Sequence, residues 1–466
     1  MKHIHSRTAL RTSVIVLLFV FSAAFAYRVL LHNPVDPDAF WHVKTGEYIV
    51  ESRSIPRTDV FSWYGQQEHL PWLPHEWLFD VALYGLWNLG GFQLVYVVTS
   101  LAYACIAPLV FLLTWMRSRR YVLGLILAVI AIAGCAHFIA PRPQVVTFPL
   151  LVGLAVLLER RQWPWALALT LVGVNLHGGL YPLFLLVIAF YTIPGRLAWL
   201  AAALPVVLVQ PLGVKLIPYP FFAFDTQMNW FKESMPTVPA ENLLFVAALL
   251  AFVLLVDRTI VPRKVLVASV ALVLLGLKGV RHIVFTYLLV APALAPYLIG
   301  DSAKDAEAPG AEPDAPAWMD RALAALLLIG ALMQVAGAQG TPLDVHASYP
   351  AGAVDYLKQH EIVRIWNDWG EGGYLIYRGV PSFVDGRADP FSPFFDPTVT
   401  LAHEYGETYL LAADIRPFLE KYGITHMLVR HSAPLFQVVS QSRDFERIYT
   451  DESHAIFAYE PGIPAP

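Results

Sequence analysis

Eleven apolar runs fill most of the first 340 residues, and no other feature of the sequence constrains the fold as strongly. They lie at residues 13–31, 92–115, 121–140, 144–158, 163–177, 180–195, 197–211, 241–257, 264–280, 283–299 and 318–338. A helix that crosses a bilayer needs about 20 consecutive, mostly apolar residues. The runs therefore predict a polytopic α-helical membrane protein with about 11 spans, of which the shorter ones are expected to be tilted or broken.

Charge separates this body from the end of the chain. Residues 341–466 hold 26 charged residues in 126 positions, or 21%, whereas the first 340 residues hold 42, or 12%. This tail (residues 341–466) has 9 basic and 17 acidic side chains, net −8, which leaves +4 of the total −4 for the body. Neither part is basic enough to indicate nucleic-acid binding. We expect the tail to be a small, water-soluble α/β domain.

Composition also sets the remaining boundaries. The body is expected to span residues 1–300, with an external loop at 32–91. Residues 301–317 are acidic and rich in Pro and Ala, which predicts a cytoplasmic linker before a last transmembrane helix at 318–340. The two cysteines, Cys105 and Cys135, both lie in apolar runs and exclude a disulfide framework or a Cys-based metal site.

Lysine and arginine predict the orientation, because short cytoplasmic loops carry an excess of both. Basic residues follow the N-terminus and recur at every second boundary: Lys2, Arg7, Arg11, Arg117, Arg119, Arg120, Arg160, Arg161, Arg196, Arg258, Arg263 and Lys264. This alternation predicts a cytoplasmic N-terminus and an extracytoplasmic tail. The apolar segment 76–89, which contains Glu76 and Asp80, would break the alternation if it crossed the membrane. We expect it to be an amphipathic helix on the outer surface.

Two carboxylates open the external loop. Asp36 and Asp38 follow the first span, and Phe40 and Val43 continue at helical spacing, which predicts an interfacial helix with Asp38 at its N-cap. A carboxylate there can act as a general base on a hydroxyl or an amine. Two carboxylates at positions i and i+2 can also hold a divalent cation, Mg²⁺ or Mn²⁺. The alternative is structural: Asp36 initiates a turn at Pro37, and Asp38 only caps a helix.

The loop resembles that of a known enzyme class. An acidic pair opening an interfacial helix, a long aromatic loop, a second interfacial helix and a span ending in basic residues are similar to the GT-C membrane glycosyltransferases. This class includes protein mannosyltransferases, the lipid A aminoarabinose transferase and oligosaccharyltransferases. The residues that carry the resemblance match the D-x-D-x-[WF]-W-H start and the later H-E-W of a bacterial branch: Asp36, Asp38, Phe40, Trp41, His42, His75, Glu76 and Trp77.

The resemblance implies an inverting glycosyltransferase of the bacterial inner membrane. Such an enzyme moves a sugar from a polyprenyl-phosphate carrier to a glycan, lipid or protein acceptor at the outer face, with an acidic residue of the first loop as base. Here that residue is Asp36 or Asp38, and Asp38 is favoured because it opens the helix. An acceptor hydroxyl must lose a proton as the bond forms, whereas a phosphate leaving group needs only positive charge nearby. Some members use a metal ion and others do not, so metal dependence stays open.

Positive charges at the predicted outer ends of spans are candidates for binding the donor phosphate. Arg142 lies at one outer turn, Lys215 and Lys232 lie in the loop 212–240, and Arg281 lies beside His282 at another turn. Arginine binds phosphate through two parallel hydrogen bonds and lysine binds it as a point charge. The alternative is that these side chains reach toward lipid headgroups, which is common at helix ends.

Histidines near the same predicted surface are further candidates. His42, His75 and His177 could bind sugar, orient an acid or together bind a metal. The alternative for His177 is a hydrogen-bonded structural residue at a helix end. Glu76 could serve as a second carboxylate or only cap the second interfacial helix.

The tail alternates helix-like and strand-like stretches. We expect helices at 353–359 and 415–422, and strands at 363–366, 374–377, 382–384, 426–429 and 455–458. Asp385 and Gly386 predict a turn. Asp385, Arg387 and Asp389 alternate, so a strand there would place them on one face, where Arg387 could pair with either carboxylate. Binding of the acceptor by this stretch is the alternative.

Other functions fit the same features. A lipid or glycan transporter, a scaffold whose outer domain binds an envelope polymer, and a polymer ligase that uses the same donor would all be polytopic. Transporters carry ionisable residues near the middle of the membrane. In this chain such residues cluster at the predicted outer ends of spans, which favours chemistry at the outer interface.

Overall fold

The computed structural model describes residues 2–193, 195–221, 237–238, 241–256, 260–298, 316–341 and 343–460. Its internal contacts divide the chain into two compact units. A helical unit holds Met1–Asn33 and Gln93–Leu343, and a mixed α/β unit holds Pro34–Phe92 and Asp344–Pro466. The division differs from the one expected from sequence, because the external loop folds with the tail. The predicted linker 301–317 lies outside the described residues except at 316 and 317.

The helical unit is built from α-helices joined by short turns. Its helices are α1 (Lys2–His32), the second half of α4 (Trp77–Ala104), α5 (Ile106–Ser118), α6 (Tyr121–Cys135), α7 (Pro143–Glu159), α8 (Trp163–Leu176), α9 (Tyr181–Thr192), α10 (Leu197–Val206), α12 (Leu243–Leu255), α13 (Arg263–Lys278), α14 (Ala291–Leu294) and α15 (Ala317–Ala338). The shorter turns are η1 (Ala136–Phe138), η2 (Gly178–Leu180), η3 (Gly213–Leu216), η6 (Val280–His282), the π-helical η7 (Thr286–Val290) and η8 (Ala295–Tyr297).

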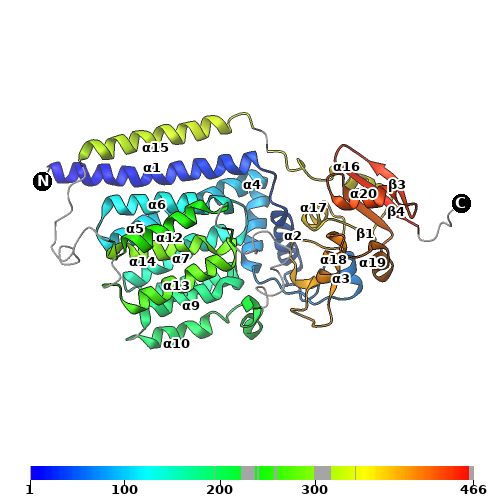
Figure 1. Cartoon of the computed structure of the whole chain (residues 1–466), viewed down its shortest axis with the longest axis horizontal. Helices are drawn as coiled ribbons and strands as arrows, with labels where there is room; N and C mark the ends of the chain where they lie inside the picture. Colours follow the sequence, from blue (N-terminus) through cyan, green and yellow to red (C-terminus); the bar gives the residue numbers. More distant parts are fainter. Residues whose placement is uncertain are drawn as a thin grey trace. The chain divides into compact units, whose positions relative to one another are not determined.

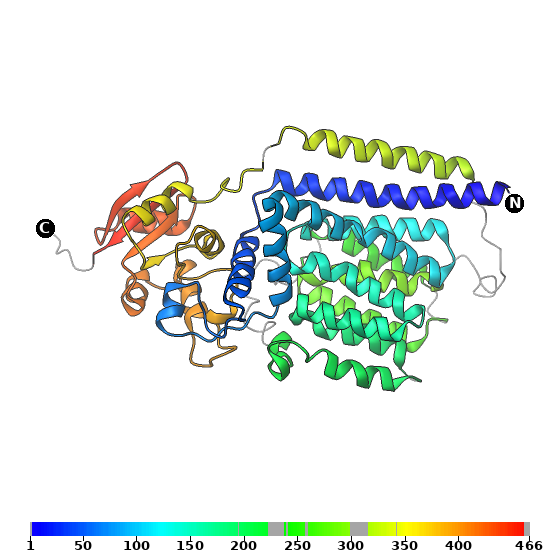
Figure 2. The same ribbon diagram turned by 180° about the vertical axis from the view of Figure 1, so that it is seen from behind.

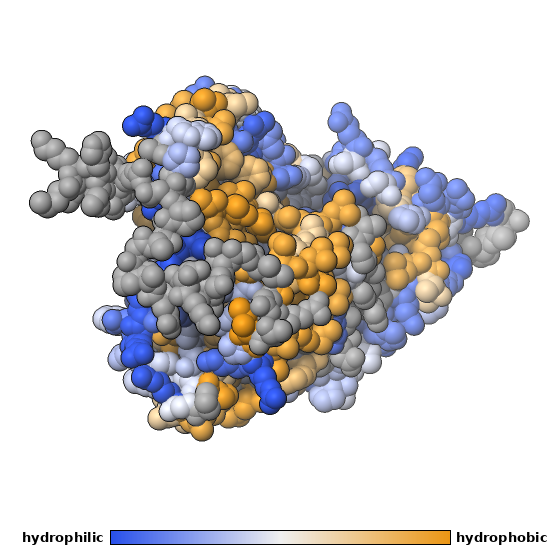
Figure 3. Space-filling view, turned by 60° about the vertical axis from the view of Figure 1, so that its left-hand side comes forward, coloured by the Kyte–Doolittle hydropathy of each residue, from blue (hydrophilic) through white to orange (hydrophobic). Residues whose placement is uncertain are grey.

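Length and composition mark this unit as a membrane body. Among the described residues, five segments are long and apolar enough to cross a membrane, and five shorter apolar helices accompany them. Helices α1 and α15 lie side by side along their length, joined at one end by Arg11 and Asp320 (Figures 1 and 2). Hydrophobic side chains gather on the face seen in Figure 3. The exposed hydrophobic residues of this unit include Leu254, Val267 and Leu332. Such exposure suits a lipid-facing surface.

Helix α4 is interrupted at a pair of glycines. Gly90 and Gly91 leave the helical conformation, and Gly91 has φ of +60°, which favours a residue without a side chain. The break falls between the predicted interfacial helix at 76–89 and the predicted span at 92–115. That span continues through Cys105 into α5.

The mixed unit consists of a small four-stranded sheet and the helices and turns that accompany it. Its helices and turns are α2 (Pro37–Ser52), α3 (Trp63–Gln67), the first half of α4, α16 (Ala351–Gln359), η10 (Trp369–Glu371), α17 (Gly372–Tyr377), η11 (Asp389–Phe391), α18 (Leu401–Tyr409), α19 (Ile415–Tyr422) and α20 (Pro434–Gln441). The strands β1 (Ile365–Trp366), β2 (His426–Arg430), β3 (Phe445–Thr450) and β4 (His454–Tyr459) have the order β1-β2-β4-β3. Only the β1–β2 pair is parallel.

The tail predictions have mixed outcomes. The predicted helices at 353–359 and 415–422 and the strands at 426–429 and 455–458 are confirmed as α16, α19, β2 and β4. The predicted strand at 374–377 is wrong, because those residues end the short helix α17. Residues 382–384 form no strand of the tail sheet, but Ser382 forms an isolated bridge with Ser62 of the external loop. Strand β3 and helices α18 and α20 were not predicted.

Aromatic residues of the external loop complete the core of the mixed unit. Trp63 and Leu70 belong to one buried cluster with Trp366, Phe383 and other tail residues. The Trp63 indole N–H donates to the carbonyl of Ile365 at 3.0 Å, and its ring stacks on Phe383. The loop and the tail therefore share one hydrophobic core, which explains why they fold together.

Candidate functional site

Asp36 caps the first helix of the mixed unit. Its Oδ1 accepts a hydrogen bond from the backbone N–H of Asp38 at 3.0 Å, and Pro37 occupies the first helical position. A side-chain oxygen at this place satisfies a backbone donor that the helix itself leaves unpaired. The prediction that Asp38 is the N-cap is therefore wrong: the cap lies two residues earlier, where the proline can follow it.

Asp38 lies inside the first turn of α2 and is half-buried. Its Oδ1 accepts a hydrogen bond from the indole N–H of Trp41 at 3.0 Å. The positive end of the helix dipole also favours a carboxylate at this position. The side chain that the sequence favoured as base is thus oriented by its own helix.

Two tail glycines lie directly against this first turn. A methyl group built on Gly386 would lie 2.0 Å from Oδ1 of Asp38 and 3.1 Å from Nε1 of Trp41. A methyl group on Gly373 would lie 2.2 Å from the carbonyl oxygen of Pro37. The tail therefore approaches the beginning of α2 more closely than any residue with a side chain could.

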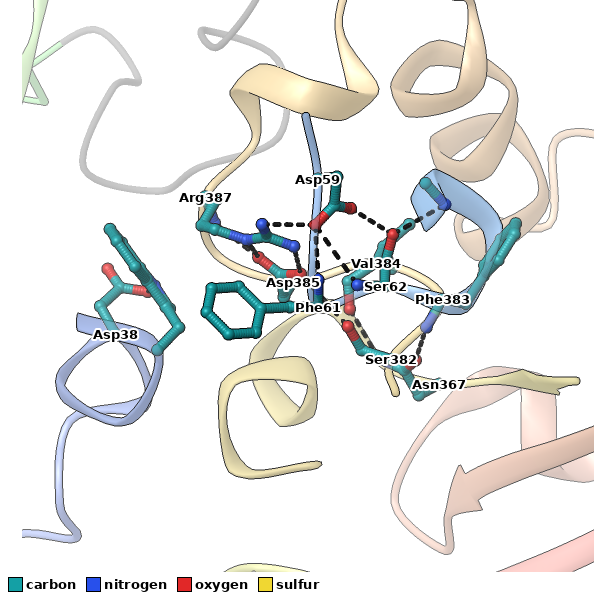
Figure 4. Close-up of polar contacts among 12 residues, drawn as sticks. Asp38, Asp59, Phe61, Ser62, Asn367, Ser382, Phe383, Val384, Asp385 and Arg387 are labelled. Carbon is teal, nitrogen blue, oxygen red and sulfur yellow. Dashed lines mark hydrogen bonds and ion pairs between the residues drawn. The ribbon is translucent and has the colours of Figure 1, made fainter. Parts of the chain in front are cut away.

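A buried ion cluster joins the same part of the tail to the external loop (Figure 4). Arg387 donates from Nε and Nη2 to the two carboxylate oxygens of Asp385, each at 2.7 Å, and from Nη1 to Oδ1 of Asp59 at 2.7 Å. All three side chains are fully buried. Asp59 also accepts from the N–H of Phe61 and from the hydroxyl of Ser62.

The surroundings of Arg387 keep its charge. Burial lowers the pKa of Arg387, but Asp385 and Asp59 raise it more, so the net pKa lies above its usual value. The guanidinium also lies 4.5 Å from the centre of the Trp72 ring, a cation–π distance. The expected pairing of Arg387 with Asp385 is present, but it occurs in an irregular loop rather than on a strand.

His75 connects the end of the external loop to the tail. Its Nε2 lies 2.8 Å from Oε1 of Glu76, and its Nδ1 lies 3.6 Å from Oδ2 of Asp389. Burial lowers the pKa of His75, but the charge and hydrogen bond of Glu76, followed by Asp389, raise it more. The net effect is a pKa above the usual value, which favours the protonated imidazolium between the two carboxylates.

This arrangement predicts a pH-dependent stability. Because the pKa of His75 is raised on folding, its stabilising contribution is complete below the unfolded pKa of about 6.5 and is lost as pH rises through the folded pKa. The thermal unfolding midpoint should therefore fall more between about pH 6 and about pH 9 in the wild type than in His75→Gln. His403→Gln, a change at an exposed histidine, should retain the wild-type dependence. Equal pH dependence in wild type and His75→Gln would contradict the prediction.

His42 is buried and paired with Asp80 of α4. Its Nδ1 lies 2.5 Å from Oδ1 of Asp80, and both side chains are almost completely buried. Gly46, one turn later on α2, lets the helix lie against the backbone of α4, since a methyl group there would lie 2.1 Å from the carbonyl oxygen of Asp80. This packing gives His42 a position between two helices of the mixed unit.

Two histidine candidates of the helical unit are connected to α7, one directly and one through Phe285. Nδ1 of His177, at the end of α8, lies 3.1 Å from the hydroxyl of Thr147 on α7. The ring of His282 contacts Phe285, which packs edge-on against Phe148, the neighbour of Thr147. His177 therefore contacts α7 directly, whereas His282 is linked to it only through the ring of Phe285.

The basic candidates occupy the ends of helices in this unit. Arg142 is the N-cap residue of α7, Arg281 precedes His282 in η6, and both are half-buried. Lys215 lies in η3 and is exposed. Lys232 lies outside the described residues, as does most of the loop 222–240.

Sequence reasoning missed Asp59, Asp80 and Gly386. Asp59 lies three residues before Ser62, and their bond is typical of a local turn, so nothing in the loop alone indicates a partner more than 300 residues away. The sequence around Gly386 predicts only a turn. Its contact with Asp38 depends on how the tail folds onto the loop.

Comparisons with known proteins give likenesses in structure but none in sequence. No family model matches the chain, and no curated protein matches it. Among solved structures, the chain is similar to the crystal structure of ArnT from Cupriavidus metallidurans bound to undecaprenyl phosphate. The likeness has a TM-score of 0.48 and 16% sequence identity, and it covers 98% of this chain and 98% of that chain.

Proposed function

We propose that this protein is an integral membrane glycosyltransferase that moves a sugar from a polyprenyl-phosphate donor to an acceptor, with Asp38 as the general base. The acceptor oxygen attacks the anomeric carbon, the bond from that carbon to the phosphate oxygen breaks, and the configuration inverts. The acceptor proton passes to the Asp38 carboxylate, and the polyprenyl phosphate leaves as an anion. The acceptor is a glycan, a lipid or a protein.

The observation that carries this proposal is the placement of Asp38. Its carboxylate is half-buried, is held by the indole of Trp41 and lies against Gly386. A base is effective when packing holds it in one geometry. Asp36 has the structural role of capping α2, whereas Asp38 caps no helix, which favours Asp38 over Asp36 for proton transfer.

Basic groups of the helical unit would bind the leaving phosphate. Arg142 and Arg281 are half-buried at helix ends, His177 contacts Thr147 of α7, and His282 contacts Phe285, which packs on Phe148 of α7. Lys215 is an exposed point charge. A developing phosphate anion is stabilised by fixed positive charge in such a place. A divalent cation, if one takes part, would bind at Asp36 and Asp38.

Localisation is part of the proposal. The apolar helices place the protein in a bilayer, which we propose is the bacterial inner membrane, with the N-terminus cytoplasmic and the mixed unit outside. Labelling of single cysteines in the tail from outside intact cells should succeed. Labelling only after lysis would reverse this orientation.

Release of the lipid carrier tests the activity without knowledge of the acceptor. The purified full-length protein in lipid nanodiscs would receive undecaprenyl phosphate linked to glucose, mannose, galactose or arabinose, with an envelope extract as acceptor source. We expect release of undecaprenyl phosphate from at least one donor, and parallel samples with EDTA, Mg²⁺ or Mn²⁺ test for a cation. Release that is no faster than with heat-inactivated protein for every donor would contradict the proposal and favour a transporter or scaffold.

A further inference from the structure

We propose that the tail loop 385–389 positions the Asp38 carboxylate, and that the missing side chain of Gly386 sets where this carboxylate stands. The inference rests on the proposed function, because it assigns a role to Gly386 only if Asp38 is the base. It gives the tail a part in the reaction beyond its own fold. Gly386 would be a positioning residue that acts through Asp38.

The tail loop contacts the external loop at three separate points. Asp385 and Arg387 form the buried ion cluster with Asp59. Gly386, between them in sequence, lies against the Asp38 carboxylate. Asp389 faces His75, the residue before Glu76. The loop therefore follows the external loop from the start of α2 to the start of α4.

The ion cluster fixes Gly386 from both sides. The neighbours of Gly386 in sequence, Asp385 and Arg387, are bonded to each other through two side-chain hydrogen bonds and one backbone N–H, at 2.7 to 3.1 Å. Arg387 is tied in addition to Asp59. With both neighbours held in this way, the backbone at 386 has little freedom to move away from Asp38. Figure 4 shows the bonds of Asp385 and Arg387.

Whether a glycine faces a backbone atom or the end of a side chain distinguishes a role in packing from a role in positioning that side chain. A methyl group on Gly372 would meet the backbone carbonyl of Val384 at 2.1 Å, and one on Gly373 would meet the carbonyl of Pro37 at 2.2 Å. Backbone atoms cannot move without disturbing the fold. A methyl group on Gly386 would instead meet the end of a side chain, Oδ1 of Asp38 at 2.0 Å. The carboxylate can rotate away while the fold stays intact.

The test is Gly386→Ala in the full-length protein, with Gly370→Ala as the matched control. A methyl group on Gly370 would make only an ordinary contact, at 3.5 Å from Asp368. With the undecaprenyl phosphate sugar that the wild type turns over, kcat of Gly386→Ala should fall about 100-fold, the loss expected when a reacting group is misplaced by about 1 Å. KM and the thermal midpoint should stay near the wild-type values, and Gly370→Ala should match the wild type in all three.

A double-mutant cycle shows whether Gly386 acts through Asp38. If it does, Gly386→Ala should cause no further loss in an Asp38→Asn background, because the group that it displaces is already inactive. Additive losses would overturn the positioning role. A structure of Gly386→Ala provides a readout that needs no activity: the Asp38 carboxylate should be displaced and its bond from Trp41 broken.

The outcomes separate this inference from the proposed function. If no sugar donor is turned over, the proposed function fails, and the structure of Gly386→Ala alone decides whether Gly386 sets the place of Asp38. If Asp38→Asn is inactive but Gly386→Ala turns over as fast as the wild type, the positioning role is wrong and the proposed base stands. If Gly386→Ala lowers the thermal midpoint but leaves the Asp38 carboxylate in place, Gly386 serves only in packing and the inference is overturned.

Discussion

Asp38→Asn should lower the transfer rate by about 10²–10⁴-fold, the usual contribution of a general base. Asparagine keeps the shape of the side chain and an oxygen that can accept from the Trp41 indole, so the fold of α2 should be preserved. It cannot accept the acceptor's proton. Release of undecaprenyl phosphate from a donor that the wild type uses measures the loss, and it should appear mainly in kcat.

Asp36→Asn is the matched control for this prediction. Asparagine and aspartate are about equally good N-cap residues, so the bond to the N–H of Asp38 should survive. If no divalent cation takes part, turnover should remain within a few-fold of the wild type. A large loss in Asp36→Asn with little loss in Asp38→Asn would exchange the roles of the two carboxylates, and full activity in both variants would refute a carboxylate base at this place.

Arg387→Met should destabilise the mixed unit by about 3–5 kcal/mol, the cost typical of removing one partner from a buried ion pair. The change leaves Asp59 and Asp385 buried without the cation that both carboxylates face. It also removes the guanidinium that packs on Trp72. Hydrogen exchange of peptides from 344–460 and from the external loop should accelerate together, because the cluster joins both segments.

Arg416→Met is the control for this second prediction. Arg416 pairs with Asp414 and Asp444, but the arginine side chain is 51% exposed. Exposed ion pairs contribute little to stability. Exchange in this variant should remain close to that of the wild type. If Arg387→Met were equally harmless, the ion cluster would not hold the two segments together.

The helical unit could be predicted well from the sequence because its signal is local. A run of apolar residues indicates a membrane span. The break in α4 lies at Gly90 and Gly91, and glycines are a sequence signal for such a break. The shorter apolar helices have fewer residues than a straight span needs.

The secondary structure of the tail is harder to predict, because its short helices and strands depend on contacts with distant residues that the local sequence pattern does not indicate. The composition of residues 374–377 (YLIY) predicts a strand, but these residues continue the helix that begins at Gly372. Gly372 and Gly373 pack closely against the backbone carbonyls of Val384 and Pro37. Propensity in so short a segment is easily overridden by packing. The edge strand β3 alternates poorly in burial, which hides its period.

Only the part of the candidate site that lies in the external loop could be predicted from the sequence. The acidic pair and its helix could be inferred from residue types and spacing, but the partner loop 385–389 could not. Asp59 and Arg387 are separated by 328 positions, and the local pattern around either residue does not indicate such a pairing. The same limit applies to His75 and Asp389.

The shared core of the external loop and the tail imposes a parity rule on the membrane topology. Both segments must stand on the same side of the bilayer for Trp63 to pack on Phe383. The chain that leaves at Phe92 and returns at Asp344 must therefore cross an even number of times. If each of the ten apolar runs that follow the external loop crosses once, the number is even and satisfies the rule. A topology with one crossing more or fewer between Phe92 and Asp344 would put the external loop and the tail on opposite sides of the membrane.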